Sequence, residues 1–539
     1  MRNSQHTQKL EIKTAESGFY AGFSHAVTLS SKFIVGSLIL WAVFFPEQAG
    51  SILNTFNSFI LSNFARWYIW AIAAFIIISA LIAAWPAAGK LKLGKDDTVP
   101  EFSYFSWFSM MFGAGIGVGM LTWSVAEPVY HFSHSPEVIQ GLATAAHENN
   151  IRNAYKWAFL HWGVGTWTCY VVVGLAMAYF SYRRDLPLTV RSSLTPIFGQ
   201  RLSGPLGHVI DVVAVVATIL GAAQALGYGV EQFVSGMYRI GLGDWLLNEK
   251  GTASAAAIVF AISVILSLTI LSALSGVGKG IKWLSNLNMA LSIFLLCFFL
   301  IFGATWFGLT SLGYGLFDYV TNLPSLMFNV WSSDGTEVND KLSAWQSSWT
   351  VFYFAWCVAF APFVGMFLAR ISKGRTIREF VIGAMVMPSL MSFVWFTWAG
   401  GTAINLELTG VANGAINAAS DGDKIFAMTE LLLSPTLAWL MAVVIVVLLL
   451  TYLVTTADSA VLVINTISAA GAEGEKARRH IVVWGLALGG MVAALLLVGG
   501  LKAIQTSMVI GALPFSLVMI LMGIAVIKAI YQDSVALKE

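Results

Sequence analysis

The sequence contains few charged residues and few cysteines for its length. Only 11% of its 539 residues are Asp, Glu, Lys or Arg, whereas 57% are hydrophobic. This balance excludes a soluble globular protein and indicates an integral membrane protein. The net charge is only +2, so no basic face or tail is available to follow the phosphate backbone of a nucleic acid.

Motifs of catalysis are also missing. The three cysteines, Cys169, Cys297 and Cys357, lie in apolar segments and have neither disulfide nor zinc spacing. Of the eight histidines, only His161 lies clearly inside a predicted span, and no histidine pair has the spacing expected of haem or zinc ligands. There is no phosphate-binding loop for ATP-driven transport. We therefore do not expect an enzyme.

What the sequence does contain is a series of long hydrophobic segments. A window of about 20 residues indicates about twelve membrane spans. Their approximate limits are 28–48, 64–88, 104–124, 153–180, 207–238, 254–274, 284–311, 346–370, 378–403, 436–465, 481–501 and 506–530. If both termini are cytoplasmic, most Lys and Arg residues fall in inward loops and tails, which follows the positive-inside rule.

Four glycines alternate within the third span, in the run Gly113-Ala-Gly-Ile-Gly-Val-Gly119. Each glycine costs a helix roughly 1 kcal/mol relative to alanine, so we predict that the helix is loose or broken here. In a bilayer, free backbone groups are tolerated only where they line a cavity or bind a ligand. The run therefore predicts a substrate or ion site of a transporter.

The eighth span is also predicted to break, at Ala361-Pro362-Phe363-Val364-Gly365, because proline removes a backbone donor and clashes with the preceding turn. The two breaks are five spans apart. Since an odd number of spans inverts the second copy, spans 3–7 and 8–12 could be inverted repeats that meet at the bilayer midplane. Isolated kinks, or a packing face at Gly115 and Gly119, are the alternative.

Four separated runs of the sequence occur in a characteristic order. They are Gly113–Gly119 with Ala126-Glu-Pro128, Ser275-Gly-Val-Gly-Lys-Gly280, the run from Gly365 to Arg375, and Thr455-Thr-Ala-Asp-Ser459. Together they resemble the betaine/choline/carnitine transporter family over nearly the whole chain. The resemblance implies an all-α membrane protein with a LeuT-type core of two inverted five-helix repeats after two N-terminal helices. It also implies a homotrimer in a bacterial cytoplasmic (inner) membrane, with both termini cytoplasmic.

This architecture divides the chain into six segments. We expect a cytoplasmic tail at 1–27, two peripheral spans at 28–100, the first repeat at 101–312, an outer loop at 313–345, the second repeat at 346–531 and a short cytoplasmic tail at 532–539. Osmosensing members of the family carry a long basic C-terminal extension. The short tail here predicts constitutive or substrate-controlled transport.

The resemblance places four aromatic residues around the ammonium group of the substrate, namely Trp162, Trp167, Tyr170 and Trp356. Most other aromatic residues of a membrane protein belong to interfacial belts or lipid contacts. A quaternary ammonium group cannot donate a conventional hydrogen bond, but each aromatic face attracts it by roughly 0.5 to 2 kcal/mol. Phe360 lies four residues after Trp356 and shares its helix face. The family's betaine carriers usually have tryptophan in place of Cys357 and Phe360, so this box is expected to differ in shape.

Gly119 bears on the charge of the substrate. Choline carriers of the family have an aspartate at this position, whose carboxylate would neutralise a cationic substrate. We therefore predict a zwitterion or neutral dipole, such as glycine betaine, dimethylsulfoniopropionate, carnitine or trimethylamine N-oxide. Its negative end is expected at free N–H groups of the broken third span, at Gly115, Gly117 and Gly119. A choline-type importer is an alternative.

The resemblance further implies sodium as the coupling ion, with no organic cofactor. Its five predicted ligands are the hydroxyls of Thr455 and Thr456 and the backbone carbonyls of Gly113, Ile116 and Tyr452. Threonines in membrane helices more often bond back to their own carbonyls, which is the alternative for this pair. A second sodium site is less complete, because its matching positions are Thr218, Ala222 and Phe363 and one hydroxyl is missing. A neighbour such as Gln224 could replace that ligand.

Two other mechanisms are weighed against a sodium-coupled importer. Sodium-independent exchangers of the family place an arginine where the ion would sit, whereas this chain has no Lys or Arg between Lys282 and Lys341. A channel suits two broken spans less well than alternating access does.

Two acidic residues within the predicted membrane region are interpreted structurally. Asp458 is a partner for backbone N–H groups or a basic loop residue in preference to a proton relay, and Glu127 marks the outer end of the broken helix.

Overall fold

The computed structural model of the protein describes residues 10–275, 282–472 and 478–536, and the side chains of 112–116 and 535–536 are outside this description. Within these ranges the chain is almost entirely helical, and its only extended pairings are three isolated β-bridges. Ten of the described helical segments are long and apolar enough to cross a membrane. The predicted all-α membrane fold is confirmed, whereas the count of twelve spans and the inverted repeat stay predictions.

The first half of the chain begins with two long helices. The α-helices in chain order are α1 (His25–Phe44), α2 (Pro46–Ala84), α3 (Tyr104–His134), α4 (Pro136–Ile139), α5 (Ile151–Trp162), α6 (Val164–Ala178), α7 (Thr195–Phe198), α8 (Pro205–Arg239), α9 (Ala255–Ser275) and α10 (Lys282–Phe302). Short 3-10 or π segments occur at η1 (Ala88–Lys90), η2 (Glu148–Asn150), η3 (Tyr179–Arg183), η4 (Arg191–Leu194), η5 (Gly199–Ser203) and η6 (Asp244–Leu246).

The second half of the chain has a comparable order of long helices and short connections. Its elements are α11 (Thr305–Leu326), α12 (Glu337–Gln346), η8 (Ser347–Val351), α13 (Phe352–Ile371), α14 (Ile377–Trp395), η9 (Phe396–Gly400), α15 (Gly401–Leu408), α16 (Ala415–Ala418), α17 (Lys424–Leu432), α18 (Pro435–Ser468) and α19 (Arg478–Ala536). Residues 313–345, expected as an outer loop, include the end of α11 and all but the last residue of α12. α19 is kinked at Gly499 and Gly500, at the end of the predicted span 481–501.

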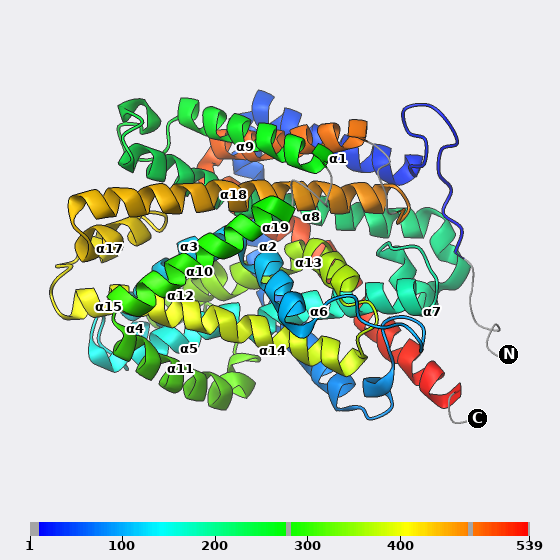
Figure 1. The fold of residues 1–539 in the computed structure, drawn as a ribbon, viewed down its shortest axis with the longest axis horizontal. Helices are drawn as coiled ribbons and strands as arrows, with labels where there is room; N and C mark the ends of the chain where they lie inside the picture. Colours follow the sequence, from blue (N-terminus) through cyan, green and yellow to red (C-terminus); the bar gives the residue numbers. More distant parts are fainter. Residues whose placement is uncertain (1–9, 276–281, 473–477, 537–539) are drawn as a thin grey trace.

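The most buried helices lie at the centre of the molecule. In the segments Glu148–Arg183 and Glu337–Ile371, 94% of the most apolar stretch is buried, against 28% in α1 and in α10. α13 packs against α6, α8 and α19, and α18 packs against α8 and α9. Figure 1 shows α18 running along the length of the molecule, with α9 and α1 on its outer side. We therefore expect the residues that bind a ligand to come from these inner helices.

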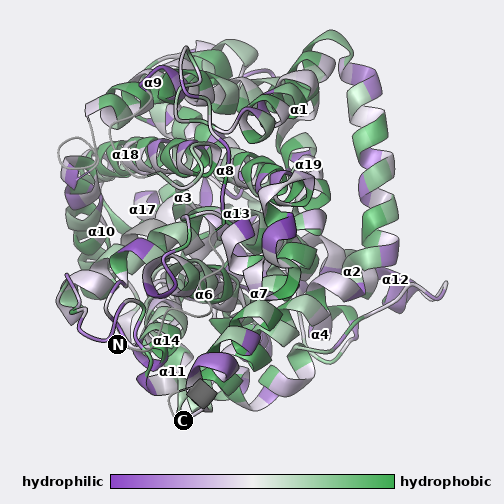
Figure 2. Cartoon of the chain, turned by 90° about the vertical axis from the view of Figure 1, so that its right-hand side faces the viewer, coloured by the Kyte–Doolittle hydropathy of each residue, from purple (hydrophilic) through white to green (hydrophobic). Residues whose placement is uncertain are grey.

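Hydrophobic residues cover most of the helical surface, as the green ribbon in Figure 2 shows. Exposed large apolar side chains are frequent on the outer helices, for example Phe33 on α1, Trp306 on α11 and Leu271 on α9. The first described residues and the end of α19 lie at the same end of the molecule, on the right in Figure 1. An even number of spans requires this arrangement.

The predicted break of the eighth span is wrong. α13 is a regular helix through Pro362, and the irregular turn of this span is the π-helical η8, further upstream. Close packing fixes α13 on two sides. A β-carbon on Gly365 would lie 3.0 Å from the backbone nitrogen of Gly174 in α6, and one on Gly221 in α8 would lie 2.9 Å from the carbonyl carbon of Ala359. These neighbours keep the helix intact across the hydrogen bond that proline removes.

Candidate functional site

The predicted break of the third span is present, in α3 at Gly117. Its backbone angles are φ 21° and ψ −142°, which are not helical. A side chain would be strained at this φ, and the hydroxyl oxygen of Thr456 lies 3.4 Å from where a β-carbon would stand. α3 therefore consists of two helical parts joined at a glycine, and Gly117, Val118 and Gly119 line a cavity at the joint.

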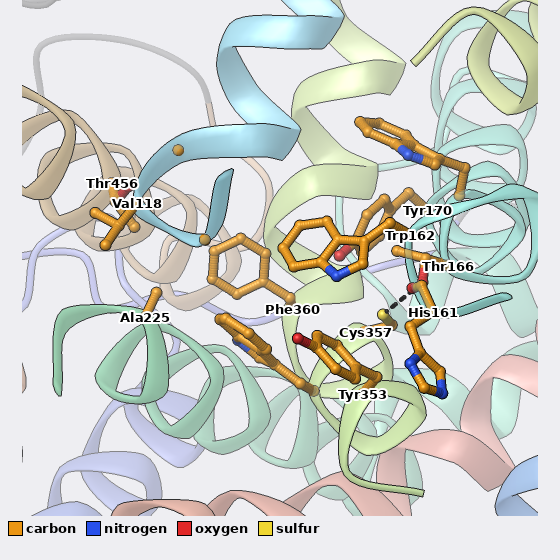
Figure 3. A pocket seen from close by; sticks show the side chains of 14 residues that line it. Val118, His161, Trp162, Thr166, Tyr170, Ala225, Tyr353, Cys357, Phe360 and Thr456 are labelled. Atoms are coloured by element: carbon orange, nitrogen blue, oxygen red, sulfur yellow. Dashed lines mark hydrogen bonds between the residues drawn. The ribbon is translucent and has the colours of Figure 1, made fainter. Parts of the chain in front are cut away.

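This cavity lies where α3, α5, α6, α8, α13 and α18 meet. Its lining consists of Gly117, Val118, Gly119, His161, Trp162, Thr166, Trp167, Tyr170, Ala225, Tyr353, Trp356, Cys357, Phe360 and Thr456. The lining includes no Asp, Glu, Lys or Arg side chain. In Figure 3 the small side chains of Thr456, Val118 and Ala225 lie on one side and the rings of Trp162, Tyr170 and Tyr353 on the other. The cavity therefore presents aromatic faces without a fixed charge in its wall.

The structure brings together all the side chains that the sequence assigned to the substrate, namely Trp162, Trp167, Tyr170, Trp356, Cys357 and Phe360. Gly117 and Gly119 join them, whereas Gly115 lies in α3 among the residues whose side-chain environment is outside the description. The rings of Trp167 and Tyr170 meet edge to face, with centroids 5.4 Å apart. The indole nitrogen of Trp356 is buried and has no hydrogen-bond partner among the described residues, so a donor is available beside the cavity.

The fourth predicted span is not one continuous helix. Gly163, with φ −90° and ψ −150°, separates α5 from α6, so Trp162 ends one helix while Trp167 and Tyr170 lie on the next. A β-carbon on Gly163 would lie 2.4 Å from the carbonyl oxygen of Phe159 and 2.7 Å from the hydroxyl oxygen of Tyr319. The bend at this glycine lets Trp162 approach Gly119 from a separate helix.

Sequence reasoning missed several lining residues, among them His161, Thr166 and Tyr353. A signal for Tyr353 was present, because the positions 353, 356, 357 and 360 follow the spacing of one helix face. Cys357 donates to the hydroxyl of Thr166 at 3.2 Å, and Thr166 donates to the carbonyl of His161. These contacts tie α13 to α5 and α6 on the side of the box that carries Cys357.

Behind Trp162 lies a buried carboxylate, Glu127 of α3. Its Oε2 accepts a hydrogen bond from the indole nitrogen of Trp162 at 2.7 Å. Its Oε1 lies 2.5 Å from Nδ1 of His161 and 3.2 Å from Nε2 of His131. All three of these partners are at least nine-tenths buried. Glu127 was expected to mark the outer end of the broken helix, but α3 continues past it to His134. Its contacts instead fix one wall of the aromatic cavity.

Comparison with known proteins identifies the group to which the chain belongs. A family model described as the betaine/carnitine/choline family transporter matches residues 26–535. The chain belongs to this family. It is 36% identical to a probable glycine betaine transporter of Desulfitobacterium hafniense over 94% of this chain and 98% of the relative. It is 34% identical to the glycine betaine transporter OpuD of Bacillus subtilis over 93% of this chain and 92% of the relative.

Choline transport also occurs among the relatives. The osmo-dependent choline transporter BetT2 of Acinetobacter baylyi is 36% identical over 93% of this chain and 70% of its own length. The chain is therefore a multi-pass membrane transporter of betaine-like substrates and not an enzyme. Its relatives are bacterial.

The residues predicted to bind sodium in this transporter are partly gathered. Thr456 faces the cavity beside Gly117. The hydroxyl of Thr455 donates to the carbonyls of Thr451 at 3.0 Å and Tyr452 at 3.1 Å, as the alternative reading expected. Gly113 and Ile116 lie in α3, at positions whose side chains are outside the description.

The surroundings of Thr455 nevertheless fit a cation. Asn288 of α10 donates to the Thr455 hydroxyl at 3.0 Å, while its own Oδ1 is buried without a partner among the described residues. The Thr455 hydroxyl has two lone pairs and the Asn288 amide uses one of them, so this oxygen keeps one acceptor site. The Tyr452 carbonyl already accepts from the Thr455 hydroxyl and from the helical N–H of Thr456. The Asn288 Oδ1 is a second oxygen of the hard type that sodium prefers.

The second predicted sodium site has a weaker donor set. Thr218 donates to the carbonyl of Ala214 at 2.8 Å, and Phe363 packs edge to face on Phe360. Gln224, proposed from sequence as a replacement ligand, is fully buried, and neither polar atom of its amide has a partner in the described ranges. Asp458 accepts from Ser272 at 2.6 Å and from Ser459 at 3.0 Å.

Proposed function

We propose that the protein is a secondary active transporter that couples sodium entry to import of a small methylated zwitterion or dipole by alternating access. The glycine betaine, dimethylsulfoniopropionate, carnitine and trimethylamine N-oxide class fits best. One observation carries the proposal: the cavity joins a broken helix to six aromatic side chains and has no Asp, Glu, Lys or Arg in its lining. A methylated onium group suits the aromatic faces, and a carboxylate end suits the free backbone N–H groups at the break.

Several features support the choice of a zwitterion over choline. A β-carbon on Gly119 would lie 2.8 Å from Cη2 of Trp162, so this position has no room for an acidic side chain while Trp162 stays in place. The indole N–H of Trp356 has no partner among the described residues, and a carboxylate accepts such a bond more strongly than the neutral hydroxyl of choline does. Two relatives named as glycine betaine transporters match along nearly all of their length.

Sodium coupling rests on the oxygen atoms around Thr455 and Thr456. The experiment is uptake of labelled glycine betaine into proteoliposomes under an imposed sodium gradient. We expect accumulation with sodium and none when potassium replaces it. Uptake that persisted in potassium and instead followed the concentration of counter-substrate inside the vesicle would favour the sodium-independent exchanger. Competition by carnitine, dimethylsulfoniopropionate, choline and trimethylamine N-oxide then ranks the ligands.

Truncation of an aromatic wall tests the box itself. Trp356→Ala is expected to raise the KM for betaine by about threefold to thirtyfold, which corresponds to the roughly 0.5 to 2 kcal/mol of one cation–π contact. Trp70→Ala is the matched control, because Trp70 lies on α2 outside the cavity lining. Its side chain is 49% exposed, and its ring faces Arg66. Uptake kinetics measure both variants. Equal effects of the two substitutions would remove the box from the mechanism.

We also propose the homotrimer that the family resemblance implies. In such an assembly each protomer would carry its own substrate cavity.

A further inference from the structure

Three side chains of types that bind metal ions lie close together beside the cavity. Glu127 and His131 lie four residues apart on α3, and His161 comes from α5. One ligand atom of each lies within 4.8 Å of the other two. The carboxylate and both imidazoles are fully enclosed, with His131 and His161 exposed by 1% or less. Within the described part of the chain, the hydrogen bonds of these three side chains involve no lysine or arginine.

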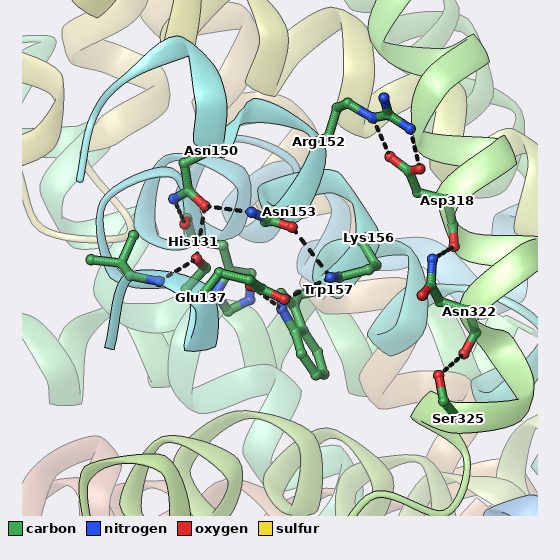
Figure 4. A network of polar contacts seen from close by, with 12 residues as sticks. His131, Glu137, Asn150, Arg152, Asn153, Lys156, Trp157, Asp318, Asn322 and Ser325 are labelled. Carbon is green, nitrogen blue, oxygen red and sulfur yellow. Dashed lines mark hydrogen bonds and ion pairs between the residues drawn. The ribbon is translucent and has the colours of Figure 1, made fainter. Parts of the chain in front are cut away.

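The positions of the two imidazoles are fixed by their surroundings. The backbone carbonyl of His131 accepts a hydrogen bond from the Asn150 side chain at 3.0 Å, and Figure 4 shows this pair. Its ring packs against Trp349, with centroids 4.6 Å apart. The ring of His161 stacks on Tyr353 at 5.0 Å, and its Nε2 lies 3.0 Å from the hydroxyl of Thr350. The cluster is therefore built before any ion arrives.

We propose that Glu127, His131 and His161 form a binding site for Zn²⁺. Two imidazoles and one carboxylate are ligands that zinc prefers, and three protein ligands leave a fourth position open to water. Ligand atoms on a tetrahedral zinc stand roughly 3.3 Å apart when the bonds are about 2.0 Å. Glu127 Oε1 lies 2.5 Å from Nδ1 of His161 and 3.2 Å from Nε2 of His131, so only a small outward movement of these atoms is needed to reach that spacing.

The hydrogen bonds around the cluster can adapt to the metal. Neutral His161 can carry its proton on Nε2 and donate it to the Thr350 hydroxyl, which frees Nδ1 for zinc. Neutral His131 can carry its proton on Nδ1, an atom that is buried and has no partner among the described residues. Glu127 binds through Oε1 while Oε2 keeps the Trp162 indole. A dication also balances the charge of the buried carboxylate.

Zinc at this site connects α3 to α5 immediately behind the cavity. His161 lines the cavity, so an ion can reach the cluster from there. Trp162 follows His161 in sequence and is bonded to Glu127, so the occupied site fixes one wall of the box. We expect zinc to lower betaine uptake and a chelator to restore it.

The primary test is direct binding of Zn²⁺ to the purified, chelator-treated protein in detergent by titration calorimetry, without substrate. We expect one zinc per wild-type chain. His131→Gln should weaken zinc binding by at least about tenfold. It removes a direct ligand, and even mutation of a residue that only hydrogen-bonds a metal ligand lowers metal affinity by about tenfold or more. His134→Gln is the control, since His134 lies on the same helix but is exposed and stacks on Tyr130. No zinc in the wild type, or equal binding by His131→Gln, would overturn the site.

A second measurement does not depend on a variant that folds. X-ray absorption at the zinc edge of the wild-type complex should show nitrogen or oxygen neighbours at about 2.0 to 2.1 Å and imidazole scattering. The competing ligands are the buried thiols Cys169 and Cys357, of which Cys357 lines the same cavity. Sulfur at about 2.3 Å would reject the proposal. Because both measurements omit transport, either failure leaves the proposed sodium-coupled import standing.

Discussion

Gly119→Ala is expected to lower the apparent affinity for glycine betaine by about fivefold to 150-fold. The added β-carbon would lie 2.8 Å from Cη2 of Trp162 and 3.7 Å from Cη2 of Trp356. Trp162 cannot swing away freely, because its indole nitrogen is bonded to Glu127 and its ring packs on Phe396 at 5.2 Å. Overpacking of this kind costs about 1 to 3 kcal/mol, and every 1.4 kcal/mol is tenfold in affinity. The KM of uptake and competition by unlabelled betaine measure the effect.

Gly119→Asp separates charge from size at the same position. It has the β-carbon of the alanine variant and adds a carboxylate inside the box. We expect betaine uptake to fall further, because two carboxylates would then share the cavity, while choline becomes the better competitor relative to betaine. A choline-to-betaine ratio equal to that of Gly119→Ala would show that charge at this position does not set specificity. Wild-type betaine affinity in Gly119→Ala would show that Trp162 is not a fixed wall.

The two helix breaks show which structural features a sequence can predict. The break at Gly117 is local, since alternate glycines weaken a helix wherever it is placed. Pro362 carries a local penalty of the same kind, yet α13 stays regular. The difference comes from tertiary packing, because Gly174 and Gly221 bring α6 and α8 into backbone contact with α13. Such contacts join residues more than a hundred positions apart, so no local rule could anticipate them.

The candidate site divides along the same line. The aromatic residues of one helix face were predictable from their spacing and from the family resemblance. His131 was not, because the third span was expected to end at residue 124, while α3 continues through Pro128 to His134. Here the carbonyl of Ser124, which loses its helical donor at Pro128, is covered by Gly400, where a β-carbon would lie 2.5 Å from that oxygen. The extra turns place His131 beside Glu127 and bury it there. Because His161 comes from another helix, the spacing of histidines in the sequence could not predict the cluster of Glu127, His131 and His161.

Glu127→Gln is expected to lower both the stability of the protein and its affinity for betaine. The carboxylate accepts from Trp162, His131 and His161 at once, whereas an amide has one acceptor oxygen and turns N–H groups toward the remaining donors. A buried donor without a partner costs about 1 to 3 kcal/mol. Trp162 then loses the bond that sets its orientation, so the betaine KM should rise by about fivefold or more. Thermal unfolding in detergent and uptake kinetics measure the two effects separately.

Glu137→Gln is the matched control for this substitution. Glu137 also accepts from an indole nitrogen, that of Trp157 at 3.0 Å, and pairs with a cation, Lys156 at 2.6 Å, as Figure 4 shows. It is not part of the cavity lining. Its loss should therefore reduce the unfolding temperature and leave the betaine KM unchanged. Glu127→Gln could instead behave in the same way, with lower stability but a wild-type KM. The carboxylate would then support the fold without orienting Trp162. The affinity of the box would have to come from the remaining rings alone.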